Sequence, residues 1–233
     1  MKNRWQPFSA VSPARVFGAL GLGLVLVLPA CTYRAGDEDN PVRRSFSWFS
    51  YLNADDLRSG CTRGAPDRYR IVYNAVWQEQ VRTYDFIIHG NGGDVKIRIT
   101  GEVDFARAIP LDDLLSPWRG STVRTRVSGA DMRRLRRALR RSGFYKPVPQ
   151  GLRLQSWGFF WVVAACEGGR FGFNAWAYPS ARFDQMHLKP VLDRLDKTAI
   201  SFNQPRETWE PDREEQKDVD RYQLVVKGNG FAR

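Results

Sequence analysis

The sequence predicts an α+β domain in which an antiparallel sheet carries helices on one face. Polar and apolar residues alternate over 69–100 and again over 157–178, which is the pattern of strands with one wet and one buried side. Each stretch precedes a segment with apolar residues at helical spacing, 128–142 and 185–199. The order of strands, helix, strands, helix predicts a two-layer domain of ββαββα type.

Three strands are expected in the first half of the domain. Apolar residues alternate with polar ones at 69–75, 84–89 and 95–100. The glycine-rich loop 90–93 separates the last two and predicts a hairpin. It resembles a phosphate-binding loop but lacks the lysine and following helix of such a loop, which favours the hairpin. Segment 101–126 is expected to be irregular, with a short helix around 111–115.

The clearest predicted helix begins after Ser128. Ser128 can cap it, Asp131 completes a capping box and Gly143 ends it. Its apolar stripe consists of Met132, Leu135, Ala138 and Leu139. Arginines cover the remaining surface, at Arg133, Arg134, Arg136, Arg137, Arg140 and Arg141. These six form a candidate anion-binding surface, and the alternative is an ordinary solvated helix face.

A second hairpin turns at Gly168-Gly169, so that Trp161 faces Trp176. One of its faces is compact and is expected to lie under the helices: Phe160, Val162, Ala164, Cys166, Phe171, Phe173, Ala175 and Ala177. The other face is a candidate binding surface: Trp157, Phe159, Trp161, Asn174, Trp176 and Tyr178. Because large exposed apolar patches are uncommon, either the chain termini or a glycan, a protein partner or a membrane should cover it.

The first thirty residues have the pattern of a signal peptide. Lys2, Arg4 and Arg15 charge a stretch without acids, and thirteen uncharged residues follow at Val16–Leu28. A membrane-spanning helix needs about 20 apolar residues. This run is therefore too short for a permanent span.

The motif Leu28-Pro29-Ala30-Cys31 resembles the lipobox of bacterial lipoproteins. The resemblance implies cleavage before Cys31, acylation of its thiol and new amine with chains such as palmitate, and a durable membrane anchor. Thr32, where aspartate is associated with inner-membrane retention, implies an outer membrane location facing the periplasm. The alternative is an ordinary secretory signal cleaved near Ala30, with Cys31 as a disulfide partner.

The remaining chain is expected to contain one domain. We expect a signal peptide at 1–30, a tether at 31–56, an α+β domain at 57–200 and a mostly disordered polar tail at 201–233. Four aromatic residues of the tether are expected to dock onto the domain: Phe46, Trp48, Phe49 and Tyr51. One short strand is expected in the tail at 222–226.

The beginning of the domain loosely resembles small ββαββα domains of uncharacterised bacterial lipoproteins. The resemblance covers roughly 57–200 and includes Cys61, Gly64, Pro66, Tyr69 and Ile71. Those domains often carry a second cysteine just before the proline, where this chain has Ala65. The likeness is architectural and implies no known activity.

The mature chain would be basic. Removing residues 1–30 takes three of the 36 basic residues and no acidic residue, which leaves 33 against 25. Basic charge often indicates nucleic acid, but export makes anionic phospholipid, lipopolysaccharide, teichoic acid or peptidoglycan the expected partner. Arg70, Lys96 and Arg98 on the wet face of the strands would suit an anionic glycan.

If Cys31 is acylated, Cys61 and Cys166 remain as an even pair, which predicts a disulfide in an oxidising compartment. The alternative is a nucleophilic Cys166 beside Glu167 or His187, as in a thiol enzyme or a cell-wall hydrolase. His89 and His187 have no acidic partners at ligand spacing, so no metal or cofactor is expected. Neither HExxH nor GxSxG occurs. The sequence therefore favours a non-catalytic, lipid-anchored envelope protein over an enzyme.

Overall fold

The computed structural model describes residues 41–101, 120–208 and 221–232, except for the side chains of 41–46. All of these residues belong to one structural unit, Cys31–Arg233. The expected signal peptide, the acylation site Cys31 and the short helix at 111–115 lie outside the described residues. Within them, the helices are too short or too polar to cross a bilayer.

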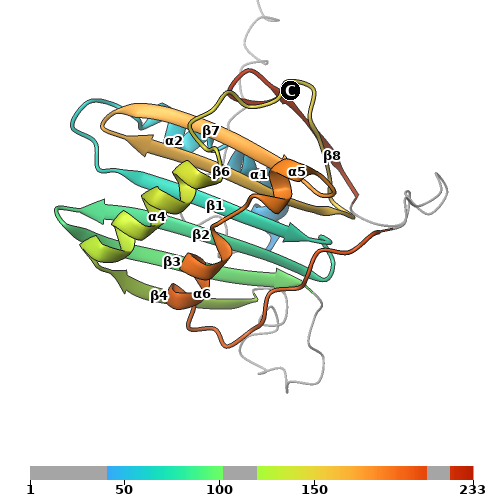
Figure 1. Cartoon of the computed structure of the whole chain (residues 1–233), viewed down its shortest axis with the longest axis horizontal. Coiled ribbons are helices and arrows are strands. Elements are labelled where there is room, and N and C mark those ends of the chain that lie inside the picture. Colours follow the sequence, from blue (N-terminus) through green and yellow to red (C-terminus); the bar gives the residue numbers. More distant parts are fainter. Residues whose placement is uncertain (1–40, 102–119, 209–220, 233) are drawn as a thin grey trace, which may run out of the picture. The chain divides into compact units, whose positions relative to one another are not determined.

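One six-stranded antiparallel sheet forms the centre of the fold, in the order β4-β3-β2-β1-β6-β7 (Figure 1). Its strands are β1 (Arg68–Ala75), β2 (Gln80–His89), β3 (Gly92–Gly101), β4 (Ser121–Val127), β6 (Phe159–Glu167) and β7 (Arg170–Ala177). β1 pairs with β2 on one side and with β6 on the other. The two predicted groups of strands therefore join through β1 into a single sheet.

Both predicted hairpins are present. β2 and β3 are joined at Gly90-Asn91, and β6 and β7 at Gly168-Gly169. The two glycines of the second turn have φ values of 56° and 75°, a conformation that most other residues adopt with strain. The turn sets the predicted register, in which Trp161 pairs with Trp176. Strand β4 was not predicted, because 101–126 was expected to be irregular.

Helices α4 (Gly129–Arg141), α5 (Ala181–Asp184) and α6 (Lys189–Leu195) pack on one face of the sheet (Figure 1). The predicted capping box of α4 is confirmed, since Ser128 and Asp131 exchange both hydrogen bonds. The expected helix at 185–199 is wrong in extent, because it spans only Lys189–Leu195. After it, the Asp196 carboxylate accepts a hydrogen bond from Thr198 N at 2.9 Å, which replaces a further helical turn.

The opposite face of the sheet is also covered. It carries α1 (Pro41–Leu52), α2 (Asp55–Ser59) and a small sheet of β5 (Arg153–Gln155), β8 (Gln223–Lys227) and β9 (Gly230–Phe231). The expectation of helices on one face only is therefore wrong, and the ββαββα arrangement is not confirmed, although the α+β class is. The physical reason is that β1 and β6 are buried at nearly every position and need cover on both sides.

Both chain termini contribute to this second cover. The expected docking of the tether is confirmed for Trp48 and Tyr51, which are buried, whereas the side chain of Phe46 lies outside the described residues. Phe49 is half exposed. The strand expected at 222–226 is confirmed as β8, whose Leu224 and Val226 are buried.

Candidate functional site

The aromatic face of the β6–β7 hairpin is buried beneath α4, α5 and α6. Phe159, Trp161, Asn174 and Trp176 are each at most 3% exposed, and Trp157 and Tyr178 are partly buried. The four buried residues therefore do not form an open surface, and neither the tether nor the C-terminal strand covers them, so the expectation is wrong for them; the compact face lies under α1, α2 and β8 instead. Large rings fill the space under three helices, whereas alanines on the other face permit closer packing.

The polar groups on this buried face are engaged within the fold. Trp176 Nε1 donates to Ser142 O at 3.1 Å, and Trp161 stacks on Tyr73 with ring centroids 4.4 Å apart. Asn174 Nδ2 donates to Lys146 O at 2.9 Å, and Asn174 Oδ1 accepts from Arg182 at 2.9 Å. These contacts fasten the chain after α4 to the sheet, so the polar groups of Asn174 and Trp176 are used within the fold.

Five of the six predicted arginines of α4 are exposed and define what we call the arginine surface: Arg133, Arg134, Arg137, Arg140 and Arg141. Arg134 pairs with Asp131 at 3.0 Å. The other four have no ion pair with any residue of the described ranges. The sixth, Arg136, turns back to the sheet, where it pairs with Asp67 at 2.8 Å and donates to Tyr69 Oη at 2.8 Å.

The elements beside the arginine surface add little negative charge to it. α6 packs next to α4, and its Asp193 pairs with Lys189 at 2.9 Å. Exposed His187 lies at the carboxyl end of α4, since its backbone N–H donates to Ser142 Oγ at 2.9 Å. Arg194 is also exposed on α6. The outer side of this helical layer is therefore predominantly basic.

The basic strand residues expected on a wet face are largely buried. Arg70 is 2% exposed, and its guanidinium pairs with Asp56 and Asp85, each at 2.7 Å. Its Cζ also lies 3.8 Å from the ring centroid of Tyr51. Arg98 is 3% exposed. The expected glycan-binding face of Arg70, Lys96 and Arg98 is therefore wrong for both arginines, which are buried. Arg70 is covered by α1 and α2, where it contacts Tyr51 and Asp56.

The predicted disulfide between Cys61 and Cys166 is confirmed, with a Cα–Cα distance of 5.6 Å. Cys166 is 2% exposed and carries no free thiol in this structure. Glu167 Oε1 accepts hydrogen bonds from Tyr69 at 2.7 Å and Tyr145 at 3.0 Å. Burial raises the pKa of Tyr69, and burial together with Glu167 raises the pKa of Tyr145 to about 12. The arrangement required for a thiol nucleophile is not assembled.

Metal ligation finds no support in the described ranges, which hold no group of three His, Cys, Asp or Glu side chains placed to bind an ion. His89 ends β2 and His187 precedes α6, and both are exposed. They belong to separate elements and share no ligand partner in the described residues.

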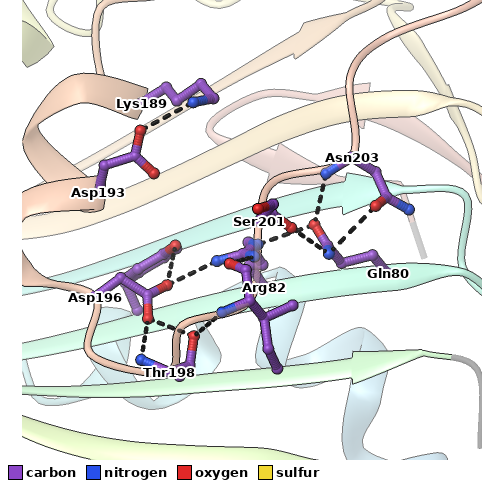
Figure 2. A network of polar contacts seen from close by, with 10 residues as sticks. Gln80, Arg82, Lys189, Asp193, Asp196, Thr198, Ser201 and Asn203 are labelled. Atoms are coloured by element: carbon purple, nitrogen blue, oxygen red, sulfur yellow. Dashed lines mark hydrogen bonds and ion pairs between the residues drawn. The ribbon is translucent and has the colours of Figure 1, made fainter. Parts of the chain in front are cut away.

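A buried polar network around Arg82, shown in Figure 2, was not predicted from the sequence. The Arg82 guanidinium, 0% exposed, donates to Asp196 Oδ2 at 2.7 Å and to Gln80 Oε1 at 2.9 Å. Gln80 in turn donates to Ser201 O at 2.9 Å and accepts from Asn203 N at 3.0 Å. Extending the alternation of Tyr84 back by two residues would have placed Arg82 on the core side.

No protein-family model, no curated protein and no solved structure matches this chain. Among the sites predicted from sequence, the arginine surface is the one whose side chains are largely exposed.

Proposed function

We propose that this protein is a lipid-anchored, non-catalytic cell-envelope protein that binds an anionic envelope polymer through the arginine surface of α4. The observation that carries the proposal is the exposure of Arg133, Arg137, Arg140 and Arg141 without an ion pair in the described residues. Guanidinium groups bind phosphate and carboxylate oxygens in bidentate geometry.

The spacing of these arginines supports binding to a repeating anion. Arg137, Arg140 and Arg141 are related by three and four positions, so they lie on one side of α4 with Cβ atoms about 5–6 Å apart. Arg140 and Arg141 also gain from the negative carboxyl end of the helix. The interaction with the helix end explains the arginines of the last turn. It does not explain Arg133 and Arg137, which repel neighbouring arginines unless an anion is present.

The disulfide supports export. Disulfides form and persist in oxidising compartments and are rare in the cytosol. The signal-peptide pattern and the lipobox-like Leu28-Pro29-Ala30-Cys31 agree with that route.

The binding test compares two variants with the same change in net charge. One replaces Arg133, Arg137, Arg140 and Arg141 with glutamine, and the matched control replaces four exposed arginines elsewhere: Arg63, Arg124, Arg126 and Arg153. Affinity for purified lipopolysaccharide and for isolated peptidoglycan sacculi is measured at low and high salt. With about 1 kcal/mol per contact, we expect the first variant to lose at least about 100-fold in affinity.

The control variant should lose much less affinity, and added salt should weaken binding by the wild type. Equal losses in both variants would mean that binding follows net charge and that α4 is not the site. A wild-type protein that binds neither polymer contradicts the proposal.

The anchor is tested separately by the intact mass of protein purified from membranes. We expect the mass of acylated residues 31–233, with no thiol available to alkylation before reduction. An unacylated mass contradicts the lipid anchor, and an alkylatable Cys166 would favour a thiol enzyme instead.

A further inference from the structure

Four aromatic rings from distant parts of the chain meet on the side of the sheet opposite α4. This ring cluster consists of Trp48 and Phe49 in α1, Trp77 between β1 and β2, and Tyr222 before β8. Trp48 and Trp77 have ring centroids 4.9 Å apart, and Tyr222 lies 5.5 Å from Trp77 and 5.3 Å from Phe49. Trp48 Nε1 donates to Tyr222 Oη at 2.9 Å.

The cluster is only partly covered by the protein. Trp48 is 6% exposed, Trp77 and Tyr222 are partly exposed, and Phe49 is 50% exposed. Phe49 packs edge-on against Tyr222, with an angle of 77° between the two ring planes. This contact holds Phe49 at the surface. A packed group of apolar rings that includes indole and phenol groups has the composition that proteins place at membrane–water interfaces.

The number of residues before α1 limits how far the ring cluster can lie from a lipid anchor at Cys31. Nine residues, 32–40, separate Cys31 from Pro41, the first residue of α1. Fully extended, such a segment spans at most about 35 Å. An anchor of this reach gives the surface around α1 an effective concentration of the order of millimolar at the bilayer. A weak contact of a few rings is then sufficient to hold this surface against the membrane.

We infer that the ring cluster is a membrane-contact surface, with Phe49 inserted at the headgroup level of the bilayer that carries the lipid anchor. The inference rests on the anchor of the proposed function and adds an orientation to it. Because α1 and α4 lie on opposite faces of the sheet, contact through the cluster turns the arginine surface away from the membrane and toward the envelope polymer.

The test uses the acylated full chain, purified from membranes and reconstituted in phosphatidylcholine vesicles with brominated acyl chains, which quench tryptophan emission. Phe49→Trp is compared with Tyr145→Trp. Tyr145 is also 50% exposed but follows α4 on the other side of the sheet, which makes it a matched control. Emission added by Phe49→Trp should be blue-shifted and quenched about twofold or more beyond that added by Tyr145→Trp.

A second variant measures the quenching of the native tryptophans in the cluster. Phe49→Ser should lower the quenching of Trp48 and Trp77 by about twofold, whereas Tyr145→Ser should leave it unchanged. Equal quenching at positions 49 and 145 in acylated protein, or unchanged quenching in Phe49→Ser, overturns the membrane contact and leaves the proposed function standing. An intact mass without acyl chains instead contradicts the proposed function.

Discussion

Arg82 Nη1 and Asp196 Oδ2 lie 2.7 Å apart although 114 residues separate them in sequence. The side chains are 0% and 6% exposed. Tyr84 also donates to the same carboxylate at 3.2 Å, and the Arg82 guanidinium lies 4.0 Å from the ring centroid of Phe202. The pair thereby fastens the segment after α6 across the sheet (Figure 2).

Replacing Arg82 alone should destabilise the protein strongly. Arg82→Leu leaves the Asp196 carboxylate buried without its cation, and breaking a buried pair in this way costs about 3–5 kcal/mol. Urea unfolding followed by circular dichroism measures the loss. The double variant Arg82→Leu with Asp196→Leu should recover part of it, since no unpaired charge remains. A single variant as stable as the double would show that the unpaired Asp196 carboxylate is not the source of the loss.

Removing the disulfide should lower stability by about 2–5 kcal/mol, because the bond closes a loop of about 100 residues in the unfolded chain. The double variant Cys61→Ala with Cys166→Ala is compared with oxidised wild type by urea unfolding. Reduced wild type is the control and should match the double variant. If reduction has no effect on the unfolding midpoint, the bond is not formed in the purified protein.

Stability should decrease in alkali. Burial raises the pKa of Tyr51, Tyr69, Tyr73 and Tyr84 above the usual value for tyrosine. Above about pH 10 the unfolded chain releases these protons while the folded protein retains them, so the free energy of unfolding falls by up to about 1.4 kcal/mol per pH unit for each tyrosine.

Two readouts check this alkaline loss. Urea midpoints at pH values from about two units below to about one unit above the usual phenol pKa of about 10 report stability, and ultraviolet absorbance reports phenolate formation. Unfolding and the ionisation of these four phenols should occur together. Ionisation at the usual pH with the fold intact would refute the expected pKa direction.

The cap of α4 should contribute about 1 kcal/mol. Its Ser128 hydroxyl accepts from Asp131 N at 3.2 Å, and the hydrogen bond from Ser128 is the main cause that lowers the pKa of Asp131. A lowered folded-state pKa gives stability that is present above the unfolded pKa near 4 and lost as pH falls through the folded value.

The pH dependence separates the cap from a general effect of substitution. Asp131→Asn should be less stable than wild type at neutral pH, and the difference should shrink in acid as the wild-type carboxyl is protonated. Ser128→Ala serves as the companion variant, since it removes the main cause of the pKa shift. A difference between Asp131→Asn and wild type that is constant over pH would mean that the charge of Asp131 is not involved.

The elements predicted correctly are those with local signals. α4 is specified by a cap, an apolar stripe and a terminal glycine within about one helix length. The β6–β7 register follows from a two-residue glycine turn. The disulfide was predicted from the even number of cysteines that remain if Cys31 is acylated, together with the expected signal peptide.

The errors concern relations between distant segments. Alternation divides the β6–β7 hairpin into two faces, but it does not say which face meets α4 and which meets α1, because both are apolar and both are buried. Arg70 was expected on the solvent side and Arg82 was given no place, since charged residues are seldom buried without partners. Their partners Asp56 and Asp196 come from segments that the strand pattern does not include.

The sequence by itself determined the α+β class, the capped arginine helix, the hairpin turns and the cysteine pair, because propensity, capping and turn geometry act within a few residues. Tertiary structure alone decided that both faces of the sheet are covered, that Trp161 and Trp176 are core residues, and that the arginine surface remains open. The reason is that burial of apolar area is non-directional. Strand alternation therefore identifies residues that must be buried, and only the folded packing decides which segment buries them.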